Sequence, residues 1–162
     1  MKESNFLAAL KQKYKLQFVE PSDEICKSYL EKAENCLKSA KLLFRNELYE
    51  NSISMSYYAM YDSLTALLFK FGIKCENHSG SILLLQKLFD RKDLSDTMSF
   101  AKKQRIDKQY YVGSKEDVKL IKDDTETMIK KAEEFIIQIR LIIEKLSLTE
   151  IKTARNKFKR RI

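Results

Sequence analysis

Apolar residues recur at helical spacing along most of the chain. Between residues 25 and 45 one stripe returns every three or four positions, formed by Ile25, Tyr29, Ala33, Cys36, Ala40, Leu43 and Phe44. A longer stripe of the same period runs from Val118 to Leu146. This periodicity predicts amphipathic α-helices, each with one face turned towards a common core.

Local signals predict where the helices begin and end. Pro21-Ser22-Asp23-Glu24 is typical of a helix start, with Ser22 as the N-cap and two acids near the positive end of the helix. The next helix is expected from about Asn51 to Phe71, ended by Gly72. It is apolar around most of its circumference, which predicts a central, buried helix.

The remaining segments complete a helical fold. Residues 6–10 predict a short first helix, residues 73–77 a loop, and residues 81–89 and 93–111 two further helices. Ser147-x-x-Glu150 has capping-box spacing, so a short basic helix can follow the long last one. Three glycines and one proline are too few for the turns of a β-rich fold.

We therefore predict an all-α fold, an antiparallel bundle of four to five main helices with short loops. Its 162 residues suit one domain, which we place at residues 1–148. Residues 149–162 are expected to form a basic C-terminal extension, either a tail or a short helix.

Positive charge is concentrated in that extension. Of the net charge of +8, six charges come from the last eleven residues, which contain no acid, so +2 is left for the rest. The extension is therefore expected to contact nucleic acid or an acidic partner with salt-dependent affinity, and the alternative is a disordered, solubilising end. Its basic residues are Lys152, Arg155, Lys157, Lys159, Arg160 and Arg161.

Composition argues against several other classes of protein. No run approaches the roughly 20 apolar residues of a membrane span, and the N-terminus lacks a signal-peptide pattern. We expect a cytoplasmic protein without a membrane or cofactor. Three cysteines without C-x-x-C spacing and a single histidine do not suggest a metal site. Cys26 and Cys36 fall on apolar stripes and are expected to pack as small hydrophobic residues.

One predicted helix is unusually rich in tyrosine. It carries Tyr57, Tyr58 and Tyr61 together with Asp62, where core helices ordinarily carry aliphatic residues. The only histidine, His78, follows before the next helix. The distinctive segments occur in the order Ser56-Tyr57-Tyr58-Ala59-Met60-Tyr61, Ala66-Leu67-Leu68, Gly72, His78-Ser79-Gly80 and Arg105-x4-Tyr110.

This succession resembles the HEPN domain over about residues 25–145. The resemblance implies a helical bundle that forms a homodimer, often with a small nucleotidyltransferase as partner in a toxin–antitoxin pair. Active members are metal-independent ribonucleases with an Arg-x(4–6)-His motif assembled across the dimer. Imidazole suits the proton acceptor of such a reaction, and guanidinium suits the charge of the phosphorane.

This chain departs from the motif at its histidine. Tyr110 stands in that position, and a phenol that titrates near ~10 is a poor base at pH 7. The catalytic candidates are therefore only Arg105 and His78. His78 either is a turn residue, in a segment capped by Asn77 or Ser79, or folds back towards Arg105 and supplies the imidazole.

The same region is expected to bind a phosphate or nucleotide. Its candidate ligand-binding residues are Arg105, Asp107, Tyr110, Tyr111, Tyr58 and Asp62. Tyr58 and Asp62 are expected on one groove wall with Arg105, and Tyr57 in the core. In the alternative, Arg105 pairs with Asp62 or Asp107 inside the bundle and the tyrosines fill space.

Three functional hypotheses follow from these features. The leading hypothesis is a nucleotide- or RNA-binding and protein-interaction module of a toxin–antitoxin or nucleotidyltransferase-associated system. The second is a metal-independent endoribonuclease acting at a dimer cleft, which an imidazole near Arg105 favours. The third is a structural helical adaptor, which a closed salt bridge of Arg105 favours.

Overall fold

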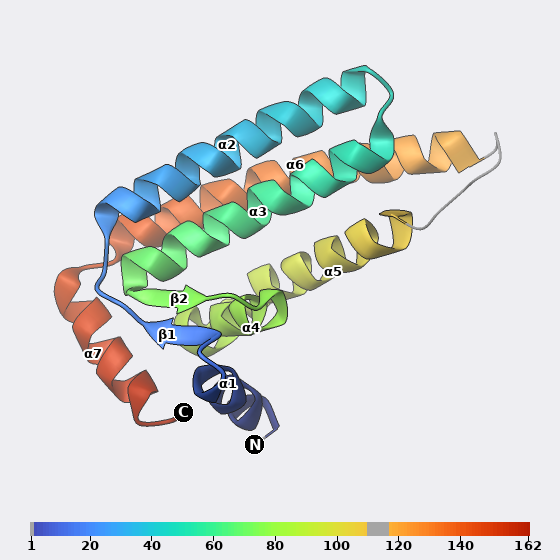
Figure 1. The fold of residues 1–162 in the computed structure, drawn as a ribbon. Coiled ribbons are helices and arrows are strands. Elements are labelled where there is room, and N and C mark those ends of the chain that lie inside the picture. The colour runs from blue at the N-terminus through green and yellow to red at the C-terminus, as the bar shows by residue number, and fades with distance from the viewer. Residues whose placement is uncertain (1, 110–116) are drawn as a thin grey trace.

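The computed structural model describes residues 2–109 and 117–162, and seven helices lie in these two ranges (Figure 1). Four are long: α2 (Asp23–Arg45), α3 (Tyr49–Phe71), α5 (Lys92–Gln109) and α6 (Asp117–Lys145). Three are shorter: α1 (Lys2–Gln12), α4 (His78–Phe89) and α7 (Leu148–Lys159). None of the described helices is both long and apolar enough to cross a membrane. The predicted all-α bundle with four to five main helices is confirmed.

Helix α3 lies at the centre of the bundle. It packs against α2, α5 and α6, and 14 of its residues are buried, which confirms the prediction of a central helix (Figure 1). It ends at Gly72, whose φ of 78° is left-handed, as expected of a residue just past a helix end. A Cβ at this position would lie 2.7 Å from the Val19 carbonyl oxygen, so the site requires glycine sterically as well.

Side-chain caps fix the starts of three helices. Ser22 Oγ accepts a hydrogen bond from the Ile25 amide at the start of α2, as predicted. At the start of α4, Asn77 is the cap, because its Oδ1 accepts from the Gly80 amide at 2.8 Å. Ser147 and Glu150 form the predicted capping box of α7. These bonds satisfy amides that the first turn of a helix leaves unpaired.

A short strand pair was not foreseen by the helical pattern. Strand β1 (Leu16–Phe18) runs antiparallel to β2 (Ile73–Cys75), with Leu16 opposite Cys75 and Phe18 opposite Ile73. The predicted loop at residues 73–77 is therefore wrong for its first three residues. Three residues are too few to show a period of two, so the sequence carries no strand signal here.

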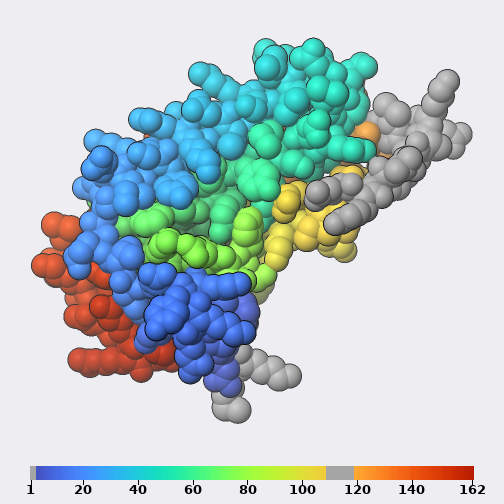
Figure 2. Space-filling view, in the orientation of Figure 1, coloured from blue at the N-terminus to red at the C-terminus, as the bar shows by residue number. Residues whose placement is uncertain are grey.

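The basic C-terminal extension forms the packed helix α7, which agrees with the predicted short helix and does not support the alternative of a disordered end. Ile151 and Phe158 of α7 are buried in the main hydrophobic core. Arg155 Nη2 donates to the Val19 carbonyl oxygen at 2.7 Å. In Figure 2, α7 lies against the N-terminal segment of the chain.

Candidate functional site

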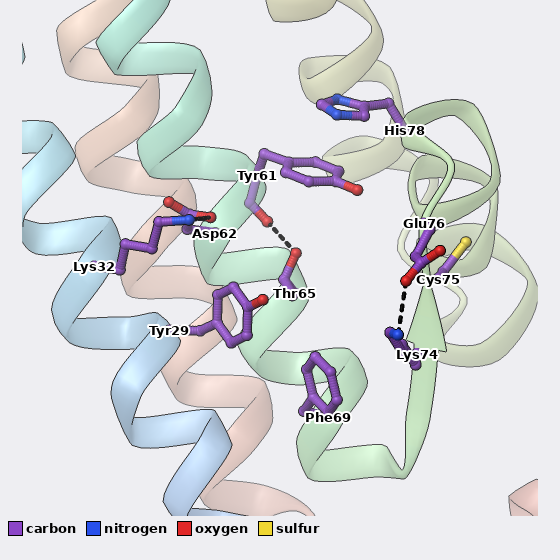
Figure 3. Close-up of a pocket in the computed structure, with 10 residues that line it drawn as sticks. All are labelled: Tyr29, Lys32, Tyr61, Asp62, Thr65, Phe69, Lys74, Cys75, Glu76 and His78. Atoms are coloured by element: carbon purple, nitrogen blue, oxygen red, sulfur yellow. Dashed lines mark hydrogen bonds and ion pairs between the residues drawn. The ribbon is translucent and has the colours of Figure 1, made fainter. Parts of the chain in front are cut away.

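Four rings and a guanidinium meet where α3, α4 and α5 approach one another. The ring of His78, the first residue of α4, lies parallel to that of Tyr61, with 3.9 Å between centroids and 1° between planes (Figure 3). His78 Nδ1 is 2.5 Å from the hydroxyl of Tyr57. The guanidinium of Arg105 lies over the rings of Tyr57 and Tyr58, 5.5 and 5.1 Å from their centroids. We call these five residues the tyrosine–histidine cluster.

The helices place these side chains together for simple reasons. Tyr57 and Tyr61 are four residues apart on α3 and so share one face. The Asn77 cap starts α4 at His78 and thereby holds the imidazole beside that face. Helix α5 packs against α3 and places Arg105 over the rings of Tyr57 and Tyr58. The cluster is therefore built from rigid elements rather than from loops.

The surroundings of His78 favour its neutral form. Burial lowers the pKa of His78 below its ordinary value, and the positive charges of Arg105 and Lys102 lower it further. Lys102 is nearby because its Nζ donates to Ser79 Oγ at 2.7 Å. A neutral imidazole can accept a proton, which a general base near pH 7 must do.

The Tyr57 hydroxyl is hydrogen-bonded to one of the two imidazole nitrogens of His78, Nδ1. Burial raises the pKa of Tyr57 strongly, so its phenol keeps the proton at neutral pH and can donate it to His78 Nδ1. In that tautomer Nδ1 is occupied and Nε2 carries the proton. In the other tautomer Nδ1 donates to the phenol oxygen and Nε2 is open as an acceptor. The tautomer therefore decides whether His78 can act as a base.

Arg105 has no acidic partner among residues 3–108 and 119–162, whose side chains the structure describes. None of the ion pairs in these ranges includes it. Asp62 pairs instead with Lys32 at 3.2 Å, and Asp107 is exposed. The described residues thus do not support the alternative in which Arg105 is neutralised by Asp62 or Asp107.

The structure separates Tyr58 from Asp62, which were expected on one groove wall. Tyr58 and Arg105 line a cavity of about 350 Å³, together with Glu50, Asn51 and Ser54. Asp62 lines a different cavity, of about 290 Å³, into which Tyr61 and His78 also project (Figure 3). The two residues are four apart on α3, but α2 covers Asp62 and α5 approaches Tyr58.

Two predicted site residues, Tyr110 and Tyr111, lie outside the described residues, so their predicted roles stay predictions. The helical pattern also missed several residues of the Asp62 cavity. Tyr29 and Phe69 stack there with centroids 5.5 Å apart, and Lys32 and Lys74 lie nearby (Figure 3). The one sequence signal for these missed residues was Tyr29 itself, a tyrosine in the apolar stripe of α2. No described group of three or more His, Cys, Asp or Glu side chains is placed to hold a metal ion.

The six basic residues of the C-terminal extension do not form one set. Lys152, Lys157, Lys159, Arg160 and Arg161 are exposed. Arg155 is half-buried and bonds to the Val19 carbonyl, so its charge anchors α7 to the fold. The predicted nucleic-acid role thus suits the five exposed side chains and does not suit Arg155.

Known proteins are similar to this chain over most of their own length. The sequence model of the HEPN domain matches residues 26–142. "Putative toxin MJ0605" of Methanocaldococcus jannaschii is 28% identical over 126 residues, which cover 76% of this chain and 92% of that protein. A "UPF0332 protein" of Thermotoga maritima is 28% identical over 129 residues, 76% of this chain and 95% of its own. Another, of Archaeoglobus fulgidus, is 31% identical, over 64% of this chain and 88% of its own. The chain belongs to the HEPN domain family.

Proposed function

We propose that this HEPN protein binds RNA through Arg105 and acts as the toxin-type component of a toxin–antitoxin system. The observation that carries the proposal is a half-buried guanidinium beside a cavity, without an acidic partner in the described chain. Two relatives from Methanocaldococcus jannaschii carry the name "Putative toxin", which supports the biological setting. A homodimer and a nucleotidyltransferase partner belong to the same proposal.

The surroundings of Arg105 suit a phosphate group. Its guanidinium lies over Tyr57 and Tyr58, and stacking of this kind leaves the N–H edge open for paired hydrogen bonds to phosphate oxygens. Lys102, one helical turn earlier on α5, adds a second positive charge. Tyr58 is half-buried and can stack with a base next to the bound phosphate.

A metal-independent endoribonuclease is the second candidate, and the neutral His78 beside Tyr57 and Arg105 favours it. In this reaction the ribose 2′-oxygen attacks phosphorus and its proton passes to the imidazole. The bond to the 5′-oxygen breaks, the 5′-oxygen takes up a proton from the imidazolium or from water, and a 2′,3′-cyclic phosphate is left. Arg105 would stabilise the negative charge that develops on the phosphorane. The reaction needs the tautomer in which Nε2 is free, whereas binding alone needs neither tautomer.

Fluorescence anisotropy of single-stranded RNA in EDTA, with gel analysis of the same samples, tests both candidates. We expect Arg105→Gln to weaken binding about tenfold or more, since hydrogen bonds to charged groups contribute about 1.5–3 kcal/mol. Lys103→Gln, at an exposed position on the same helix, is the control and should change affinity less than twofold. Equal losses in the two variants would indicate a nonspecific charge effect.

Cleavage separates the two candidates. Cutting by the wild-type protein that disappears in both Arg105→Gln and His78→Gln would assign a ribonuclease. Binding without cutting would assign a binding module. Affinity unchanged in Arg105→Gln would remove Arg105 from the site and overturn the proposal.

A further inference from the structure

The cavity around Asp62 is lined by two pairs of aromatic rings. Tyr29 of α2 and Phe69 of α3 form one pair, and Tyr61 and His78 form the other (Figure 3). The cavity of about 290 Å³ also reaches strand β2. Its rings are half-buried, and Lys32 Nζ lies 5.5 Å from the centroid of the Tyr29 ring, so a flat ligand that covers Tyr29 there displaces this ammonium. Base–aromatic stacking is worth about 1–3 kcal/mol per base, which makes such a lining suited to a nucleobase.

The charges in this cavity cancel one another. Lys32 pairs with Asp62 at 3.2 Å, and Lys74 pairs with Glu76 at 2.7 Å. An anion such as phosphate would have to separate a lysine from its carboxylate before it could bind. Arg105 and Lys102 lack acidic partners within the described chain, so the phosphate preference belongs to that side of the cluster. A neutral planar group fits the Asp62 cavity better.

Asp62 can recognise such a group. Asp62 is 4% exposed, and its carboxylate receives hydrogen bonds from Lys32 on Oδ1 and from the Cys36 thiol on Oδ2. An ionised carboxylate has about four acceptor positions, so two remain. Lys32 is 62% exposed and can move away from the cavity without repacking the core. An incoming N–H donor would find a buried carboxylate with capacity left.

We propose that this cavity binds a nucleobase with an exocyclic amino group, which stacks against Tyr29 and Tyr61 and donates to Asp62. Carboxylates accept from the amino group of cytosine in other recognition surfaces. The inference rests on the proposed RNA-binding function when the base belongs to RNA, and a free nucleoside offers the same chemistry. His78 lines this cavity and also bonds to Tyr57 beneath Arg105, so a base and its phosphate could bind on adjoining sides.

Calorimetric titration with cytidine and uridine tests the cavity directly. We expect cytidine to bind more tightly, because uridine presents an oxygen where cytidine presents its amino group. Tyr29→Ala should weaken cytidine binding about 10- to 100-fold through the loss of stacking, and Tyr29→Phe should retain it. Tyr14→Ala, at a 78% exposed tyrosine outside the cavity, is the control. Equal binding of the two nucleosides, or no effect of Tyr29→Ala, would overturn the proposal.

The role of Asp62 needs a variant that keeps the fold. Asp62→Asn retains the shape of the side chain, and its circular dichroism should match that of the wild type. An amide both donates and accepts, so the preference for cytidine over uridine should disappear. If Asp62→Asn does not fold, Lys32→Met tests the same point, because it should leave the preference in place and strengthen cytidine binding. Loss of the preference in Lys32→Met would contradict recognition by Asp62.

Oligocytidylate and oligouridylate of equal length separate this inference from the proposed function. Arg105→Gln should weaken both, whereas Tyr29→Ala should weaken oligocytidylate more than oligouridylate. If both RNAs bind through Arg105 and Tyr29→Ala changes neither, the base site is wrong and the RNA proposal stands. If neither RNA binds while cytidine binding depends on Tyr29, the RNA proposal is wrong and the cavity is a site for free nucleosides.

Discussion

At the scale of residues, His78 is the group whose charge the fold controls most directly. Burial and the charges of Arg105 and Lys102 lower its pKa below the ordinary 6.5. Because it is the only histidine, NMR titration of its ring protons reports this value without ambiguity. We expect a midpoint below 6.5 in the wild type and a higher midpoint in Arg105→Gln, which lacks one of the positive neighbours.

The same shift fixes the direction of a stability effect. A histidine whose pKa is lowered on folding binds fewer protons in the folded state. Its contribution to stability is therefore complete above about pH 6.5 and is lost as the pH falls through the lowered value. If the NMR titration midpoint of His78 in Arg105→Gln is equal to or below that of the wild type, the electrostatic effect of Arg105 on His78 is contradicted.

The sequence indicated which residues form the candidate site better than it indicated which helices pack against them. The tyrosine-rich helix and His78 were recognisable from the sequence, and the structure brings both to Arg105. Helical spacing also placed Tyr58 and Asp62 on one side of α3, but their neighbours come from different helices. Spacing along one helix specifies a face and carries no information on which helix will cover each part of it.

At the scale of elements, Gly72 lies where the end of α3 approaches the backbone of Val19 and the side chain of Arg155 in α7. It ends α3 with a φ of 78°, and a Cβ there would lie 2.7 Å from the Val19 oxygen and 2.9 Å from Arg155 Cζ. We expect Gly72→Ala to lower the free energy of unfolding in urea by at least about 1–2 kcal/mol, the cost of a left-handed alanine. The clash with the Val19 backbone adds to that cost.

Glu47 provides the matched comparison for this variant. It follows α2 with a φ of 59°, a conformation that glycine adopts more easily. Glu47→Gly should therefore leave stability unchanged or slightly raised, in contrast to Gly72→Ala. Equal losses in the two variants would show that the left-handed geometry at Gly72 does not govern stability.

The long elements were predictable from the sequence and the short ones were not. Ser22, Gly72 and the Ser147–Glu150 capping box marked helix ends that the structure has. The strands β1 and β2 lie far apart in the chain and are three residues each, so nothing local could pair them. Arg155 looked like one more charge in a basic run, yet its bond to the Val19 carbonyl depends on how α7 docks.

At the scale of the whole molecule, the fold gathers positive charge from distant segments onto one region. Four exposed basic residues, Lys157, Lys159, Arg160 and Arg161, lie at the end of the chain. Lys11 of α1 donates to the carbonyl of Ile162, and Lys87 of α4, which pairs with Glu3 of α1, lines a cavity with α7. Figure 2 shows α1 and α7 as neighbours on this side of the molecule. A polyanion could contact all three helices there.

The packing of α7 decides how this surface should be tested. Deletion of residues 152–162 would remove Phe158 from the core and Arg155 from its carbonyl partner, so a loss of binding would not be informative. Replacement of Lys157, Lys159, Arg160 and Arg161 by glutamine keeps both anchors. If the surface binds RNA, the slope of log affinity against log salt should fall by up to about 0.7 for each phosphate that is no longer neutralised.

Two features of the outcome would identify a phosphate-binding surface. The quadruple variant should lose affinity mainly at low salt and keep its dependence on Arg105, because the two sites contribute separately. Lys27→Gln with Lys38→Gln, on the outer side of α2, serves as the control and should leave the slope unchanged. A wild-type slope in the quadruple variant would mean that the charges of α7 face solvent or a protein partner, and that RNA is held at the tyrosine–histidine cluster alone.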